Sequence, residues 1–301
     1  MKKNVLFFLL LSICLNAQIN RFFYEYKYVP DINNKTEVNN EMMLLDVDSK
    51  GSNYYSYDRF VSDSTMMANI EKQLKTGGAL NLEDKGKSGL IDYKVTKSYP
   101  DFNTCLFQNI SYDKYKIKEN EKPEWKVLNE KQKIGEYNAQ KATTSFGGRD
   151  WIAWFSTEIP IQDGPYKFYG LPGLIVKLED TTGTHIMTLV GNKSVKASAE
   201  TEKDKETKVG GVSVMFTRNK EIEVTKEKFR KLWKEYVNDP SKNMRNMVNA
   251  IGGDGGNVIV KHMDRNGNEI TDPNKVARER AKLAKESLAK NNNPIEPDLV
   301  K

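Results

Sequence analysis

Cysteine and histidine are scarce in this sequence. Its 301 residues include two cysteines, Cys14 and Cys105, and two histidines, His185 and His262. Cys14 lies in an N-terminal segment that we expect to be removed, so the remaining chain cannot form an internal disulfide. A zinc site with three or four histidine or cysteine ligands is not expected either. We therefore predict no metal and no cofactor, and a fold stabilised by burial of its core.

A hydrophobic run long enough to span a membrane is also missing. The chain begins MKKNVLFFLLLSICLNAQ, with two lysines, a short apolar run and a small-residue site. A transmembrane helix needs about 20 mainly apolar residues, whereas the apolar stretch here is Val5–Leu15. This pattern is typical of a secretory signal peptide, so we predict cleavage after Ala17. Ile13 precedes Cys14 where a lipoprotein signal needs a small residue, which argues against lipidation.

The predicted export defines where the protein acts. We expect a mature chain without a transmembrane anchor, located in the periplasm, at the outer membrane or outside the cell. Its formal charge of +6 falls to +4 when Lys2 and Lys3 are removed with the signal peptide. Acidic and basic residues alternate in 202–206, as in a solvated loop. Nucleic-acid binding needs a concentrated basic face, so we predict no nucleic-acid partner.

Alternation of apolar and polar residues indicates β-strands along most of the chain. Two or three strands are expected within 20–60, and further strands at 94–99, 104–113, 125–128, 141–146, 151–155, 174–178, 184–190 and 211–217. Polar turns separate them, and 193–208 is expected to be an exposed, charged excursion. The fold class predicted is mainly β, an antiparallel meander forming an open barrel or half-barrel, with a few helices.

Helical periodicity occurs in three segments. Ser62–Ser64 offers caps for a helix up to Leu74, and 225–236 carries apolar residues on one face. A strongly charged helix is expected over 276–290. Asn266-Gly267 is a hairpin signal, and the glycine-rich segment 252–256 is interpreted as a loop. We predict a β domain over 18–220 and a helical and hairpin C-terminal segment over 221–301, packed on the same domain.

The sequence GLPGLI, Gly170–Ile175, predicts a stiff turn before a strand. Pro172 fixes its own φ and disfavours helical backbone at Leu171, while Gly170 and Gly173 permit conformations closed to other residues. We therefore expect this motif to have a structural role that depends on backbone conformation.

These six residues match the signature of the GLPGLI family letter for letter, and the chain resembles a member. The similarity extends to Trp154-Phe155, Glu158-Ile159-Pro160, Gly164-Pro165 and Asn292-Asn293-Pro294-Ile295-Glu296. The resemblance implies an exported protein of a diderm bacterium. The family has no established activity that could be transferred to these residues, so the resemblance implies fold and location.

A cluster of aromatic residues is the candidate ligand-binding site. In one interpretation these residues form the core and rim of the β structure. In the other, alternation places Trp151 and Phe155 on one strand face, where they could line a concave apolar site while Arg149 holds an anionic group. The candidate residues are Arg149, Trp151, Trp154, Phe155, Tyr166 and Tyr169.

The sequence is compatible with two functions. The first is a non-enzymatic envelope protein that binds an apolar or peptidic ligand, or an outer-membrane partner. The alternative is an envelope hydrolase, acting on peptides, in which Glu158, Asp163 or Asp180 provide acid and base. Neither histidine stands in a recognisable catalytic pattern, so no catalytic residue is assigned.

Overall fold

The protein is described from a computed structural model. The residues it describes are 18–76, 89–111, 113–196, 207–209, 212–214, 221–243, 245, 262–263 and 269–301. The predicted signal peptide, the segment 252–256 and the turn Asn266-Gly267 lie outside the described residues. Within the described part, no helix is both long and apolar enough to cross a membrane.

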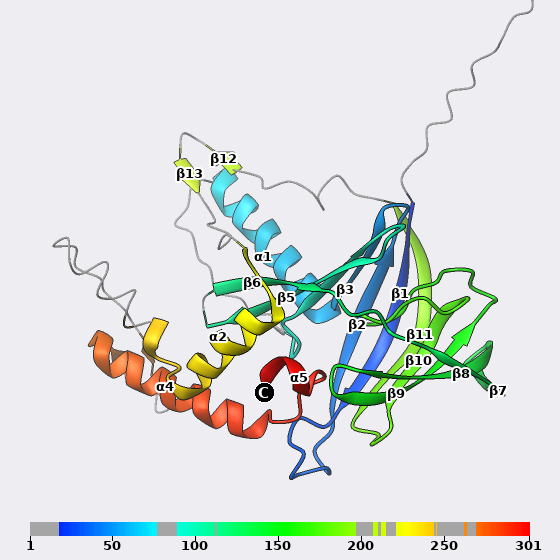
Figure 1. Ribbon diagram of the computed structural model, residues 1–301. Coiled ribbons are helices and arrows are strands. Elements are labelled where there is room, and N and C mark those ends of the chain that lie inside the picture. Colours follow the sequence, from blue (N-terminus) through cyan, green and yellow to red (C-terminus); the bar gives the residue numbers. More distant parts are fainter. Residues whose placement is uncertain are drawn as a thin grey trace, which may run out of the picture.

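One sheet of 12 strands dominates the molecule (Figure 1). Its strand order is β14-β6-β5-β4-β3-β2-β1-β11-β10-β9-β8-β7. The strands are β1 (Gln18–Tyr28), β2 (Asn39–Val47), β3 (Gly51–Ser56), β4 (Lys94–Ser98), β5 (Asn103–Ile110), β6 (Asp113–Glu119), β7 (Lys126–Ile134), β8 (Tyr137–Phe146), β9 (Arg149–Ser156), β10 (Leu174–Asp180), β11 (His185–Lys196) and β14 (Ile222–Val224).

The order shows two antiparallel meanders joined through β1. Strands β1 to β6 form one, β7 to β11 form the other, and β1 pairs with both β2 and β11. Burial alternates along β1 because successive side chains point to opposite faces of a strand. The predicted mainly β, open architecture is confirmed, since the two edge strands, β7 and β14, do not pair with each other. Parallel pairing of β14 with β6 makes the sheet mixed.

Four helices accompany the sheet among the described residues. Helix α2 follows β14, and its N-cap Thr225 accepts a hydrogen bond from the Lys228 amide at 3.2 Å. Asp272 caps α4 in the same way. Phe229 of α2 and Leu299 of α5 belong to the main hydrophobic core. The helices are α1 (Tyr57–Thr76), α2 (Lys226–Asn238), α4 (Pro273–Lys290) and α5 (Pro297–Val300).

The start of α1 differs from the prediction. Ser62–Ser64 lie inside the helix, which begins at Tyr57. The Oγ of Ser56 accepts a hydrogen bond from the Arg59 amide at 3.2 Å, so the last residue of β3 acts as the cap. The Ser64 hydroxyl donates to the Phe60 carbonyl one turn earlier. Ser64 therefore bonds within the helix instead of starting it.

Three strand predictions also need correction. The single strand expected over 104–113 is two strands, β5 and β6, because Ser111 adopts a left-handed φ of 56° and the chain turns there. The segment expected to resume the main sheet at 211–217 instead contains β13 (Val212–Val214), which pairs with β12 (Thr207–Val209) in a separate hairpin. Residues 193–196, expected in an exposed excursion, continue β11 and pair with β1.

Candidate functional site

The aromatic residues of the candidate site are packed in the protein interior. Exposed fractions are 1% for Trp151, Phe155 and Tyr166, 7% for Trp154 and 9% for Tyr169. The rings of Trp151 and Tyr166 both contact the ring of Phe168. The Trp151 indole also donates a hydrogen bond to the Phe146 carbonyl at 3.0 Å. With so little surface exposed, these rings contribute to the packing of the core.

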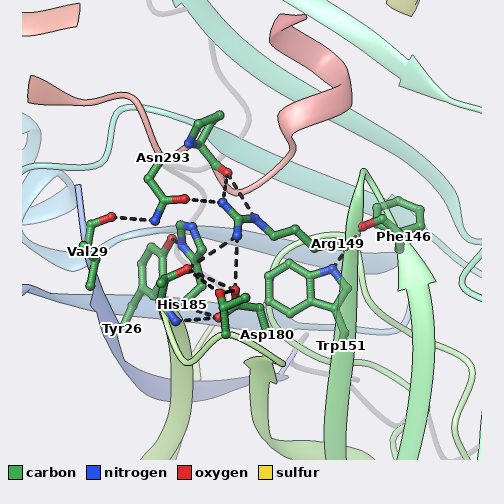
Figure 2. A network of polar contacts seen from close by, with 11 residues as sticks. Tyr26, Val29, Phe146, Arg149, Trp151, Asp180, His185 and Asn293 are labelled. Carbon is green, nitrogen blue, oxygen red and sulfur yellow. Dashed lines mark hydrogen bonds and ion pairs between the residues drawn. The ribbon is translucent and has the colours of Figure 1, made fainter. Parts of the chain in front are cut away.

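Arg149 binds the C-terminal part of the chain (Figure 2). Its Nη2 donates to the Pro294 carbonyl at 2.7 Å and to Asn293 Oδ1 at 2.5 Å, while Nη1 pairs with Asp180 at 3.1 Å. The Asn293 amide in turn donates to the Val29 carbonyl at 2.8 Å. Arg149 thus links the start of β9 to residues that follow α4, and most of its donors are occupied within the protein.

His185 is buried behind this arginine. It exposes 1% of its surface, and Tyr26 Oη lies 2.7 Å from its Nδ1. Burial, together with the charge of Arg149, lowers the pKa of His185 to about 3, so the imidazole is neutral at neutral pH. Burial alone would raise the pKa of Asp180, but hydrogen bonds from Thr182 and from the His185 backbone outweigh it and lower that pKa. The Asp180 carboxylate accepts hydrogen bonds from the backbone amides of Thr184 and His185 and so fixes the β10–β11 turn.

A buried ion pair anchors the loop between β9 and β10. Lys97 Nζ lies 2.5 Å from Asp163 Oδ1, and neither side chain is exposed. Lys97 also donates to the Gly164 and Tyr166 carbonyls at 2.7 and 3.0 Å. The Tyr99 hydroxyl donates to the other carboxylate oxygen of Asp163 at 2.5 Å. Burial lowers the pKa of Lys97, and the adjacent carboxylate acts in the opposite direction.

A second buried charge cluster joins this loop to the C-terminal residues. Lys167 Nζ lies 2.9 Å from Glu119 and 2.5 Å from Glu296. Tyr166 Oη donates to Glu296 at 2.9 Å, and Lys226 binds the second oxygen of Glu119 at 2.7 Å. Burial alone would raise the pKa of Glu119, but Lys167 and Lys226 outweigh it and lower that pKa. Both of these carboxylates are held by cations of the same chain.

The three carboxylates of the hydrolase hypothesis have separate partners. Asp163 binds Lys97 and Tyr99, whereas Asp180 binds Arg149 and neighbouring hydroxyl and backbone groups. Glu158 accepts hydrogen bonds from Asn138. Asp163 and Asp180 are buried, and Glu158 is exposed. In the part of the chain described, no three histidine, cysteine or acidic residues are grouped so that they could hold a metal ion.

The GLPGLI sequence shapes the end of this loop through its backbone. Gly170 and Gly173 have φ values of +92° and +153°. A Cβ on Gly173 would lie 2.2 Å from the Ser156 carbonyl oxygen, whereas a Cβ on Gly170 would meet nothing within 4 Å. Leu171 is buried, and the Ile175 amide donates to the Asp163 carbonyl at 3.0 Å. Glycine at 173 is therefore required for the close approach of two backbone segments.

An open groove of about 580 Å³ lies beside the same loop. Phe102 is one of its lining residues, with a left-handed φ of 52° that is rare for a bulky side chain. Its ring stacks on Tyr169 with a centroid distance of 4.5 Å. Turns after β2 and β4, the start of β1 and the loop after β9 meet here. The lining residues are Gln18, Asn20, Val47, Asp48, Ser49, Tyr99, Pro100, Phe102, Pro160, Ile161 and Gln162.

The charged residues that hold this region together were not predicted from the sequence. The burial of Lys97 could have been predicted. It stands two residues after Val95 in a strand, so the two side chains lie on the same strand face. Lys167 and Glu296 are separated by 129 positions, and nothing in the local pattern connects them. Phe102 was missed because it lies in a turn between two short strands.

A family model described as a protein of unknown function (Porph_ging) matches residues 148–177. The matched segment contains Arg149, Tyr166, Lys167 and the GLPGLI sequence. No curated protein matches the sequence. Among solved structures, the chain is similar to PNGF-II in space group C2, at a TM-score of 0.45 and 15% identity, covering 72% of this chain and 32% of that one.

PNGF-II in space group P21 is similar at a TM-score of 0.41 and 17% identity, covering 62% of this chain and 30% of that one. The chain therefore spans about a third of the length of these structures. A similarity at this level carries no information about function.

Proposed function

We propose that this is an exported envelope protein of the GLPGLI family that binds an apolar or peptidic ligand, or an outer-membrane partner, without catalysis. The proposed ligand site is the groove beside the GLPGLI loop. This location differs from the aromatic cluster of Trp151, Trp154 and Phe155, because those rings are buried. Export rests on the signal-peptide pattern of the N-terminal sequence.

The composition of the groove carries the proposal. Tyr99, Phe102 and Ile161 are only partly buried and provide apolar surface. Exposed amide side chains, Gln18 and Gln162, stand at the same groove. Apolar surface with a few polar groups is the usual composition of a ligand site, and amides can pair with a peptide backbone. The strained backbone of Phe102 is a further feature common at functional sites.

The hydrolase alternative has less support from the same residues. A general acid and a general base must both reach the reacting bond of the substrate. The two carboxylates therefore need to face a common cavity. Asp163 and Asp180 instead bind different cations, Lys97 and Arg149, and both are buried. An activity screen against envelope peptides remains the direct test of this alternative.

Native mass spectrometry of the mature protein, purified gently from its own envelope, tests the binding proposal. We expect the wild type to carry a bound small molecule, peptide or protein. Replacing Ile161 with aspartate places a charge in the apolar groove and is expected to reduce the bound fraction at least tenfold.

Val127→Asp is the matched control, because Val127 is 46% exposed on β7 and does not line the groove. It is expected to retain the bound species at the wild-type level. A wild-type protein without any bound species, or equal retention by Ile161→Asp, would contradict tight binding in this groove. A retained membrane protein would identify the accessory role.

A further inference from the structure

The C-terminal segment, residues 291–301, contacts the sheet as a bound peptide would. Asn293 is 8% exposed, and its backbone amide donates to the Pro30 carbonyl at 3.1 Å. Its side chain accepts from Arg149 and donates to the Val29 carbonyl. The Asp298 amide donates to the Gly147 carbonyl at 3.3 Å. Backbone and side chain of the segment are thus both recognised, as in peptide complexes.

Charge makes this recognition specific for a carboxylate. One carboxylate oxygen of Glu296 accepts from both Tyr166 and Lys167. The side chain of Lys167 has no exposed surface. Without Glu296, the one carboxylate left to Lys167 is that of Glu119, which also binds Lys226. Loss of one of its two counter-charges is unfavourable for a cation as buried as Lys167. The site therefore favours a negatively charged side chain at this position.

The shape of the sheet residues also fits the segment. Gly147 and Gly148 form the β8–β9 turn with φ values of +64° and +85°. A Cβ on Gly147 would lie 2.5 Å from Glu296 Cγ, and one on Gly148 would lie 2.6 Å from Asp298 Oδ1. The turn thus leaves space that side chains of the segment fill. Leu299 is 5% exposed and joins the main core.

The segment is connected to the fold through a helix that packs apart from the main core. Val276 and Ala277 of α4 are buried in a separate small cluster with Ile270. Helix α4 has 18 residues and is therefore about 27 Å long, and the C-terminal segment follows at its end. A second open groove, also of about 580 Å³, lies where the C-terminal segment meets the β8–β9 turn. Gly148 and Asp298 are among its lining residues. The groove therefore borders the segment at Asp298.

We propose that Arg149, Lys167, Tyr166 and the Gly147-Gly148 turn form a peptide-binding cradle whose resident ligand is the C-terminal segment. Its ligand is an extended peptide with the pattern Asn-Pro-Xaa-Glu, as in 293–296. The same cradle accepts this segment from a second copy of the chain, because α4, which precedes the segment, is buried in a cluster separate from the main core. This site is distinct from the groove proposed for the ligand.

The test uses the full-length mature chain and a fluorescent peptide of residues 291–301. In the variant Asn293→Ala/Glu296→Ala, the resident segment loses its side-chain contacts with Arg149, Val29, Tyr166 and Lys167 and competes less well for the cradle. We expect the labelled peptide to bind this variant at least tenfold more tightly than the wild type, measured by fluorescence anisotropy, because the intact segment competes at high effective concentration.

Two controls make the result specific. Adding Arg149→Met to the variant is expected to weaken peptide binding at least tenfold, since it removes the contacts to Asn293 and Pro294. A peptide in which Glu296 is replaced by lysine is expected not to bind. If the variant unfolds cooperatively, as a folded chain does, but does not bind the wild-type peptide, the proposal is overturned.

Native-state hydrogen exchange on the wild type covers the case in which the variant does not fold. The amides of Asn293, Asp298 and Leu299 are hydrogen-bonded to backbone carbonyls. Exchange of the segment between copies requires that it open without unfolding the sheet. We expect these amides to exchange at least a hundredfold faster than those of the central strand β1. Equal protection in both regions would overturn the proposal.

Discussion

Replacing Asp163 with alanine is expected to lower the free energy of unfolding by about 3–5 kcal/mol, measured by urea denaturation near neutral pH. The substitution leaves the ammonium group of Lys97, which has no exposed surface, with only carbonyl acceptors. The double variant Lys97→Met/Asp163→Leu removes both charges and is expected to recover most of this loss. A loss below about 1 kcal/mol in the single variant would contradict a buried ion pair.

The loss in Asp163→Ala is expected to depend on pH. Burial lowers the pKa of Lys97, and the variant lacks the carboxylate that acts in the opposite direction. The folded-state pKa of Lys97 therefore lies below the unfolded value of about 10.4. Between these two values the unfolded chain binds more protons, so stability rises with pH. The destabilisation should shrink as pH rises towards the unfolded-state pKa of Lys97, and the double variant should not show this change.

Replacing Lys167 with methionine is expected to lower the free energy of unfolding by a similar amount, about 3–5 kcal/mol. Lys167 is the cation between Glu119 and Glu296, and all three side chains are at most 3% exposed. Its removal leaves the buried carboxylates of Glu119 and Glu296 without their shared cation, although Lys226 still binds Glu119 at 2.7 Å and Glu121 at 3.6 Å. Urea denaturation near neutral pH measures the loss.

The destabilisation by Lys167→Met depends on pH with the opposite sign to that by Asp163→Ala. Burial raises the pKa of Glu119 and Lys167 lowers it, so removal of Lys167 raises the folded-state pKa of this carboxyl. The destabilisation is therefore present at neutral pH and is relieved as pH falls through the raised pKa.

Lys242→Met is the matched control, since Lys242 and Glu235 form an exposed pair at 3.0 Å. Its removal is expected to cost less than about 1 kcal/mol. Equal losses for Lys167→Met and the control would contradict the structural role of the buried cluster.

Local patterns predicted the strands well because each strand has its own alternation. β1 and β9 follow from alternating aromatic and polar residues, and the GLPGLI sequence predicted a stiff turn that the glycine φ values confirm. The start of α1 was predicted wrongly because Ser56, still in β3, provides the cap. The turn at Ser111 was missed because a left-handed serine has no strong sequence signal.

Long-range charge pairing could not be predicted from the sequence. Lys97 pairs with Asp163, and Lys167 with Glu296, across large separations in the chain. Each pair depends on the curvature and register of the whole sheet, which local periodicity does not encode. The groove could not be predicted for the same reason, because its lining residues come from the start of β1 and from three separate turns and loops.

The GLPGLI sequence supplies a backbone shape to the loop beside the groove, and thermal unfolding of Pro172→Ala/Gly173→Val tests this role most directly. Valine at 173 would have to adopt a φ of +153° with its Cβ 2.2 Å from the Ser156 carbonyl oxygen. We expect a fall in Tm of at least about 6 °C, together with any loss of bound ligand. A variant that melts like the parent but no longer retains its ligand would contradict the structural role, because the motif would then act through recognition.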